Sequence, residues 1–181
     1  MFSAGLISFL TAALAVVPAV SGFPDLSTHK DVKVEVEIKA SADTVWRILT
    51  NFPAYDIWNP YIYPASGDPV AGQTLDLTLR GSTVIHFTPK VLLAKPDEKL
   101  SWAGTVPLGG GQRVLTFEIT TLEPHRVRLV AVEQFNGLLL PLASGVTSDA
   151  DAGLKAMTRA LRNRAELLDF SSPGPAPVHL P

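Results

Sequence analysis

The chain has 181 residues, of which 46% are apolar and 18% charged, a balance typical of a folded domain with a sizeable core and not of a disordered chain. Its 15 cationic and 17 anionic residues give a formal net charge of -2 and form no basic run, which argues against nucleic-acid binding and against a polybasic membrane patch. The absence of cysteine excludes disulfides, thiolate nucleophiles and the common structural zinc sites.

The first 22 residues carry no charged side chain. An apolar run over residues 6–17 is broken by Pro18, and residues 19–22 are the small residues that suit a cleavage site. This pattern predicts a secretory signal peptide over 1–22, and therefore a protein that is secreted or resides in the lumen of the secretory pathway. The alternative is an uncleaved N-terminal anchor, because the run is barely long enough to span a bilayer. Residues 23–30 are interpreted as a linker.

A strand and two short helices are expected next. Residues 32–38 alternate valine or isoleucine with lysine or glutamate, which predicts a strand with one solvated face. Ser41 can cap a first helix that ends near Pro53. A second helical turn is expected over 54–58. Residues 61–72 are loop-like, because proline and glycine recur through them.

Five further strand signals follow, and short turns separate them. The strands lie at residues 74–80, 83–93, 100–102, 115–119 and 127–135, and the turns at 81–82, 95–97, 108–111 and 123–125. Short spacers between consecutive strands predict antiparallel neighbours. Pro89 interrupts the second of these strands, so the chain has six or seven strands in all.

One long amphipathic helix is predicted near the C-terminus, over 148–170. Ser148 can cap it. The helix carries an apolar stripe at helical spacing, formed by Leu154, Met157, Leu161 and Leu168. The proline-rich tail 171–181 is expected to be disordered. The order of strand, two short helices, run of strands and long helix predicts an α+β fold with its helices on one side of an antiparallel sheet.

Several segments, and the order in which they stand, also point to a known superfamily. They are residues 40–46 (Ala-Ser-Ala-Asp-Thr-Val-Trp), 49–52 (Leu-Thr-Asn-Phe), 55–60 (Tyr-Asp-Ile-Trp-Asn-Pro), 100–102 (Leu-Ser-Trp) and 133–137 (Glu-Gln-Phe-Asn-Gly). With these segments and the C-terminal helix, residues 31–170 resemble the SRPBCC (START-like, helix-grip) superfamily. The resemblance implies a seven-stranded antiparallel sheet wrapped around the long helix, with a hydrophobic cavity between them. Members include polyketide cyclases and dehydratases, lipid carriers, hormone receptors and co-chaperones, so the fold implies a cavity and not a reaction.

Glu133 is the candidate catalytic residue. By strand alternation it points to the same apolar side as Leu129, Ala131 and Phe135. A carboxyl group buried there would have a raised pKa and could act as a general acid or base. The alternatives are that Glu133 meets water at a fraying strand end, or that it pairs with an arginine.

Seven residues are predicted to contact a ligand. Trp58, Asn59 and Tyr61 follow the second helical turn, near the cavity mouth that the resemblance implies, and aromatic rings with one polar tip suit a ligand entrance. The alternative is that Trp58 packs under the first helix and Asn59 caps a turn. The other predicted contacts are core residues first and ligand contacts second: Trp102, Phe135, Met157 and Leu161.

No cofactor or metal is expected. The four histidines, His29, His86, His125 and His179, lie far apart, and no pair has metal-ligand spacing. His86 stands on the less apolar face of its strand and is expected to face solvent. The glycines at 109–111 lack the lysine and hydroxyl residue of a phosphate-binding loop.

Two functions are therefore open. The first is a pocket enzyme that, by resemblance to polyketide cyclases and dehydratases, encloses a hydrophobic intermediate of specialised metabolism and guides its cyclisation, dehydration or isomerisation without metal or nucleotide. The second is a non-catalytic carrier or sensor of a lipid or other apolar ligand. A polar side chain deep in the cavity favours the enzyme, and an all-apolar lining favours the carrier. Membrane contact is expected only through an uncleaved N-terminal segment.

Overall fold

The computed structural model describes residues 29–105, 111–137 and 144–170. The predicted signal peptide or anchor, the linker before His29, most of the turn at 108–111 and the tail 171–181 lie outside the described residues. The described elements, in chain order, are β1 (His29–Ile38), α1 (Ala42–Thr50), the 3-10 turn η1 (Phe52–Ala54), α2 (Tyr55–Trp58), β2 (Ile62–Ser66), β3 (Asp76–Arg80), β4 (Val84–Phe87), β5 (Lys90–Lys95), β6 (Lys99–Thr105), β7 (Gln112–Glu123), β8 (Arg126–Asn136) and α3 (Ser144–Phe170).

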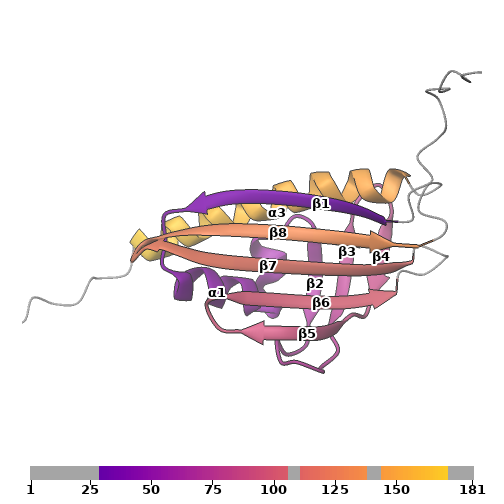
Figure 1. Cartoon of the computed structure of the whole chain (residues 1–181), viewed down its shortest axis with the longest axis horizontal. Helices are drawn as coiled ribbons and strands as arrows, with labels where there is room; N and C mark the ends of the chain where they lie inside the picture. The colour runs from indigo at the N-terminus through magenta and orange to yellow at the C-terminus, as the bar shows by residue number, and fades with distance from the viewer. Residues whose placement is uncertain (1–28, 106–110, 138–143, 171–181) are drawn as a thin grey trace, which may run out of the picture.

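Two antiparallel sheets support one long helix (Figure 1). The larger sheet has the order β1-β8-β7-β6-β5 and the smaller one the order β2-β3-β4. Backbone hydrogen bonds link the two sheets where the chain enters β5, among them one from the Leu75 N–H to the Pro89 carbonyl at 2.9 Å. The helix α3 packs along the larger sheet, chiefly beside β1. The predicted α+β helix-grip class is thus confirmed.

The described part of the chain contains eight strands, more than the six or seven expected. The count of seven assumed that Pro89 divides the predicted strand over 83–93, and the structure divides it there into β4 and β5. The additional strand is β2, which lies in the segment predicted to be a loop. Its pairing with β3 shifts register between Ile62 and Ala65, and both of these residues are buried, so the two-residue alternation that marks a strand is lost.

The long helix begins four residues earlier than predicted, at Ser144, and Ser148 is an exposed residue inside it and not its cap. The expected start rested on Ser148 as a cap, and the turn before it contains Gly145, an unfavourable residue in a helix. Leu168 is 43% exposed, so it does not belong to the buried stripe, because the last turn of α3 extends past the core. The stripe that is buried consists of Ala150, Leu154, Met157, Leu161 and Ala165.

The core fills the middle of the molecule with large side chains. The Trp102 ring packs against Phe52 and Phe117, with ring centroids 6.0 and 5.6 Å apart. Fully burying a side chain of this kind stabilises the fold by about 1.5–3 kcal/mol.

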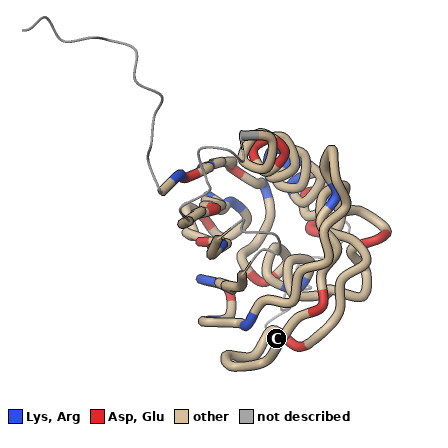
Figure 2. The backbone as a smooth tube through the Cα atoms, turned by 90° about the vertical axis from the view of Figure 1, so that its right-hand side faces the viewer, with Lys and Arg blue, Asp and Glu red and all other residues tan. Residues whose placement is uncertain are grey.

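Figure 2 shows acidic and basic residues interspersed along the described backbone. Among the described residues, no helix is long and apolar enough to cross a membrane, and no three histidine or carboxylate side chains gather as a metal site would require.

Asp169 joins the end of α3 to two other parts of the fold. Its Oδ1 accepts hydrogen bonds from the Ser41 N–H at 3.1 Å, the Ser41 hydroxyl at 3.0 Å and the Thr44 hydroxyl at 2.9 Å. Its Oδ2 lies 2.7 Å from Nδ1 of His125, in the turn between β7 and β8. Burial acts to raise the pKa of Asp169, but these hydrogen bonds outweigh it and lower the pKa from 3.8 to about 2.

We expect the Asp169→Asn variant to lose about 1–2 kcal/mol of unfolding free energy at pH 7, because the hydrogen bonds favour the ionised form. The pKa is lowered in the folded state, so this stabilisation is present above pH 3.8 and is lost as the pH falls toward about 2. The measurement is urea unfolding of the wild type and the variant at pH 7 and pH 2.5.

The matched control is Asp151→Asn on the same helix, where the carboxylate makes one surface pair with Lys155 at 2.7 Å. Such an exposed pair contributes at most about 0.5 kcal/mol. A difference between wild type and Asp169→Asn that is equally large at pH 2.5 and at pH 7 would show that the charge of Asp169 is not what stabilises this junction.

Candidate functional site

Three polar side chains from distant parts of the chain meet in the interior. We call Tyr61, Arg113 and Glu133 the buried triad; Arg113 is 3% exposed and Glu133 is fully buried. Arg113 Nε donates to Glu133 Oε1, and Arg113 Nη2 donates to the Tyr61 hydroxyl oxygen. The Tyr61 hydroxyl donates to Glu133 Oε2 at 3.4 Å. One guanidinium group is thus fixed by a carboxylate and a phenol at the same time.

The strands place Arg113 and Glu133 side by side. Within the β7–β8 pair, Leu115 lies opposite Glu133 and Arg113 lies opposite Phe135. Arg113 and Glu133 are therefore diagonal neighbours on the face that packs against α3, a spacing that long side chains can bridge. Tyr61 stands directly before β2 and reaches them from the smaller sheet.

The surroundings keep the arginine charged and the tyrosine protonated. Burial acts to lower the pKa of Arg113, but the Glu133 carboxylate and the Tyr61 hydroxyl together raise the pKa above its usual value. Burial raises the pKa of Tyr61, and the nearby Glu133 raises it further, against the opposing effect of Arg113. The rings of Phe135, Phe87 and Tyr61 lie 5.2, 5.8 and 5.8 Å from the guanidinium carbon of Arg113, so the cation is surrounded by aromatic faces.

Two residues hold Tyr61 in place. Asn59 Oδ1 accepts hydrogen bonds from the backbone N–H groups of Tyr61 and Ile62, both at 3.0 Å. On the other side, the Tyr61 ring lies against the backbone of α3 at Gly153, where a Cβ atom would lie 2.2 Å from Tyr61 Cδ2. Glycine inside a helix costs about 1 kcal/mol relative to alanine. The close approach of the tyrosine ring explains why a glycine stands there.

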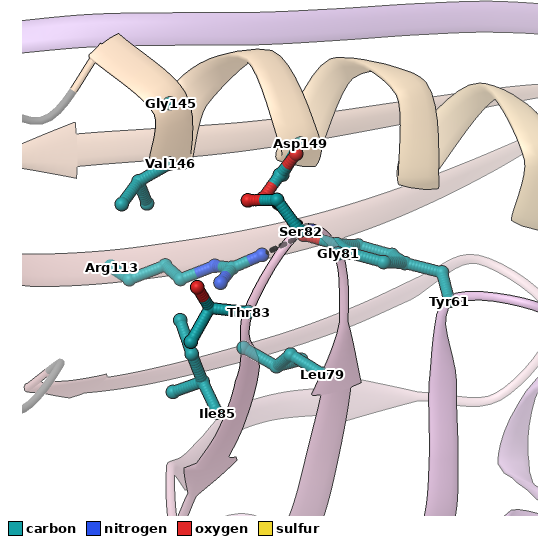
Figure 3. Close-up of a pocket in the computed structure, with 10 residues that line it drawn as sticks. All are labelled: Tyr61, Leu79, Gly81, Ser82, Thr83, Ile85, Arg113, Gly145, Val146 and Asp149. Carbon is teal, nitrogen blue, oxygen red and sulfur yellow. Dashed lines mark hydrogen bonds between the residues drawn. The ribbon is translucent and has the colours of Figure 1, made fainter.

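A pocket of about 280 Å³ opens beside the triad, at the end of the molecule where α3 begins (Figure 3). Tyr61 and Arg113 form its buried inner end. Its apolar walls are Leu79 and Ile85 from the β3–β4 hairpin and Val146 from α3. At its rim, Asp149 Oδ2 accepts hydrogen bonds from the Ser82 N–H at 2.8 Å and the Ser82 hydroxyl at 2.5 Å. These bonds tie the tip of the hairpin to α3.

Of the predicted site residues, Tyr61 lines this pocket, and two more lie behind it, in contact with Arg113. Glu133 and Tyr61 belong to the triad, and Phe135 packs beside Arg113. Glu133 faces inward as strand alternation predicted, and of the alternatives considered for it the structure shows pairing with an arginine.

The other predicted contacts lie elsewhere. Asn59 caps a turn and positions Tyr61. Trp58 packs against Tyr55, with ring centroids 4.9 Å apart, and lines a separate hollow of about 260 Å³ between α1 and the end of α3. The remaining three are fully enclosed in the core and line neither this pocket nor the hollow beside Trp58: Trp102, Met157 and Leu161. His86 is exposed, as expected.

Sequence reasoning missed Arg113, the residue that organises the site. The strand signal was read from Leu115, but β7 begins at Gln112. Extending the alternation of Leu115 and Phe117 backward by two residues places Arg113 on the same inward face. One signal could have identified the pair. Arg113 is an arginine on an apolar strand face, and it stands two positions from Leu115, the residue that lies opposite the inward-facing Glu133.

A curved antiparallel sheet, a long C-terminal helix and a pocket with a polar inner end define a small-molecule-binding protein of the helix-grip type. The sequence model of the family described as "Polyketide cyclase / dehydrase and lipid transport" matches residues 29–162. The chain belongs to that family. The predicted membership of the START-like superfamily is thereby confirmed.

Solved structures share the fold. A START superfamily protein from Mycobacterium smegmatis is 23% identical with a TM-score of 0.62, over 76% of this chain and 98% of that one. The ZhuI aromatase/cyclase from Streptomyces sp. R1128 is 19% identical with a TM-score of 0.59, over 75% and 95%. A norcoclaurine synthase from Thalictrum flavum is 18% identical with a TM-score of 0.60, over 80% and 97%. No curated protein matches the sequence.

Proposed function

We propose that the chain binds an apolar small molecule in the pocket beside the triad and acts on it as a cyclase- or dehydratase-like enzyme. The observation that supports this most is Arg113, a charged residue that is 3% exposed and yet lines the pocket. A charge that serves only stability is costly in such a place, because desolvation offsets most of the gain from an ion pair. A guanidinium group held at the inner end of an apolar pocket is suited to bind an oxygen atom of the ligand.

The chemistry follows from that placement. When a hydroxide ion of the solvent takes a proton from the carbon next to a carbonyl group, negative charge develops on the carbonyl oxygen, and a fixed cationic donor stabilises it. Cyclisation and dehydration of carbonyl compounds both pass through such a species. The Tyr61 hydroxyl, whose proton is directed to Glu133 Oε2, accepts from Arg113 and helps to hold the guanidinium group at this end. The aromatic rings around Arg113 exclude water, and the narrow pocket holds the ligand in a reactive conformer.

Glu133 has a different role in this proposal from the one that the sequence suggested. Its Oε1 is bound by Arg113 and its Oε2 by Tyr61, and it does not line the pocket itself. We therefore propose that Glu133 positions the guanidinium group of Arg113. Of the predicted ligand contacts, Tyr61 lines the pocket, and Phe135 packs against the guanidinium group of Arg113 behind it.

The alternative is a non-catalytic carrier or sensor. The apolar walls formed by Leu79, Ile85 and Val146 and the lipid transport in the family description support it. Such a protein would use Arg113 only to orient its ligand. Under either proposal, the secreted or lumenal location predicted from residues 1–22 remains a prediction.

The enzyme proposal is tested by exchange of the methyl protons of 2-acetylnaphthalene in D2O, followed by proton NMR. We expect the protein to accelerate exchange by about 10- to 100-fold, because Arg113 stabilises the enolate. Gly145→Leu should abolish this acceleration, since Gly145 lines the pocket and its Cβ would meet no atom within 4 Å. The larger side chain would fill the pocket without straining the fold.

The matched control is Ala152→Leu, which adds similar bulk on an exposed position of the same helix and should leave exchange unchanged. Binding of the ketone without accelerated exchange would contradict the enzyme proposal and support the carrier. Absence of binding, or binding that Gly145→Leu leaves intact, would reject both uses of this pocket.

A further inference from the structure

The donors of Arg113 are divided between the triad and the pocket. Nε and Nη2 are occupied by Glu133 and Tyr61. The third nitrogen, Nη1, donates to no described residue, and it is not among the buried side-chain nitrogens that lack a partner. Because Arg113 lines the pocket, this free edge of the guanidinium group faces it, next to Tyr61 (Figure 3). A ligand oxygen can therefore be bound without breaking the triad.

The positive charge of Arg113, in contrast, is already compensated. Glu133 lies in direct contact with the guanidinium group and is completely buried, so water does not screen it from the pocket. Of the described residues that line the pocket, only two carry a charge, Arg113 and Asp149. Residues 106–110 and 138–143, outside the described part, contain no charged side chain. One cation thus stands against two carboxylates.

This balance separates ligands by charge. A carboxylate bound to Nη1 would be a third anion around one guanidinium group, and it would also lose its hydration in a pocket with apolar walls. A ketone, ester or hydroxyl oxygen accepts the same hydrogen bond and leaves no charge unpaired.

We propose that the pocket selects ligands whose polar end is an uncharged oxygen, and that it discriminates against carboxylates of the same shape. The proposal rests on the proposed function in that it uses the same pocket. It separates two classes of apolar ligand: neutral carbonyl and phenolic compounds are accepted, and free fatty acids and aromatic acids are rejected.

The test compares two ligands of nearly equal shape, 2-acetylnaphthalene and 2-naphthoate, by calorimetric titration at pH 7.5. We expect the ketone to bind at least about tenfold more tightly than the acid, which corresponds to about 1.4 kcal/mol. Asp149→Asn removes one of the two opposing carboxylates at the half-exposed rim, and it should narrow this ratio by strengthening the binding of naphthoate. Glu133→Gln, which removes the other carboxylate, should lower the ratio of ketone affinity to acid affinity further.

The outcomes separate the two proposals. If neither ligand binds, the proposed function is rejected and this inference with it. If both bind, and the acid binds as tightly as the ketone or more tightly, only the inference is rejected. A ratio that favours the ketone but does not change in Asp149→Asn would also overturn it, because the selection would then not come from the charges of the pocket. Asp149→Asn keeps the test decisive if Glu133→Gln fails to fold.

Discussion

Replacement of Arg113 by methionine is expected to lower the free energy of unfolding by about 3–5 kcal/mol, the cost of leaving one partner of a buried ion pair alone. Glu133 is fully buried, and without Arg113 its described hydrogen-bond partner would be the Tyr61 hydroxyl, 3.4 Å away. Methionine fills a similar volume with a flexible apolar chain. The loss therefore reports the uncompensated charge and not a cavity. Urea unfolding at pH 7 is the measurement.

The control for this prediction is the double variant Arg113→Met/Glu133→Leu. Replacing a buried ion pair by apolar side chains of similar size is often close to neutral in stability, so the double variant should be more stable than Arg113→Met alone. It should nevertheless fail to accelerate ketone exchange. If Arg113→Met costs less than about 1 kcal/mol, a magnitude typical of exposed pairs, Glu133 must reach water in solution, and the closed triad would be contradicted.

Gly153→Ala is expected to abolish ketone exchange and to destabilise the fold, although alanine is the better helix former. A Cβ at this position would lie 2.2 Å from Tyr61 Cδ2 and 2.4 Å from Cε2, closer than any non-bonded contact. The Tyr61 ring must move, and its hydroxyl then leaves Arg113. Overpacking of this kind costs about 1–3 kcal/mol, more than the gain of about 1 kcal/mol in helix propensity. Exchange and urea unfolding are measured on the same sample.

The same substitution at Gly145 is the control for stability. Gly145 lies in the same helix, and a Cβ there would have no neighbour within 4 Å. Gly145→Ala should therefore leave stability unchanged or raise it slightly. If Gly153→Ala stabilises the protein as much as Gly145→Ala does, the ring of Tyr61 does not lie against α3, and its role in positioning the hydroxyl would have to be given up.

The parts of the fold that follow local patterns could be predicted from the sequence. The alternation of residues 32–38 and 127–135 corresponds to β1 and β8, and Ser41 caps α1 as expected, accepting from the Thr44 N–H at 3.2 Å. The prediction failed where tertiary contacts override the local signal. An irregular pairing hides β2, and a glycine in its first turn conceals the start of α3.

The candidate site was predicted in part, for a related reason. Strand alternation was sufficient to turn Glu133 inward. Tyr61 was expected near the cavity mouth from the resemblance alone, and it lies instead at the buried inner end of the pocket. The contact between them spans 72 residues of sequence, and that between Arg113 and Tyr61 spans 52, so no local spacing reveals either one. Gly153 shows the same limit, since in sequence it is only an unfavourable residue in a helix, and the packed structure supplies its reason.

The expected hydrophobic cavity has a different position from the one that the helix stripe suggested. Met157 and Leu161, which were expected to share in it, are fully buried beside the aromatic core. The pocket lies instead toward the first turns of α3, where small residues follow one another: Gly145 lines it and Gly153 admits Tyr61. The open space therefore lies beside Gly145 and not beside the apolar stripe of α3.

A crystal structure of the protein with 2-acetylnaphthalene bound tests the central claim most directly. The account predicts the naphthalene rings between Leu79, Ile85 and Val146, with the ketone oxygen about 3 Å from Nη1 of Arg113, a normal hydrogen-bond distance, and the triad unbroken. A ketone found in the hollow beside Trp58, or one that turns its oxygen away from Arg113, would contradict it.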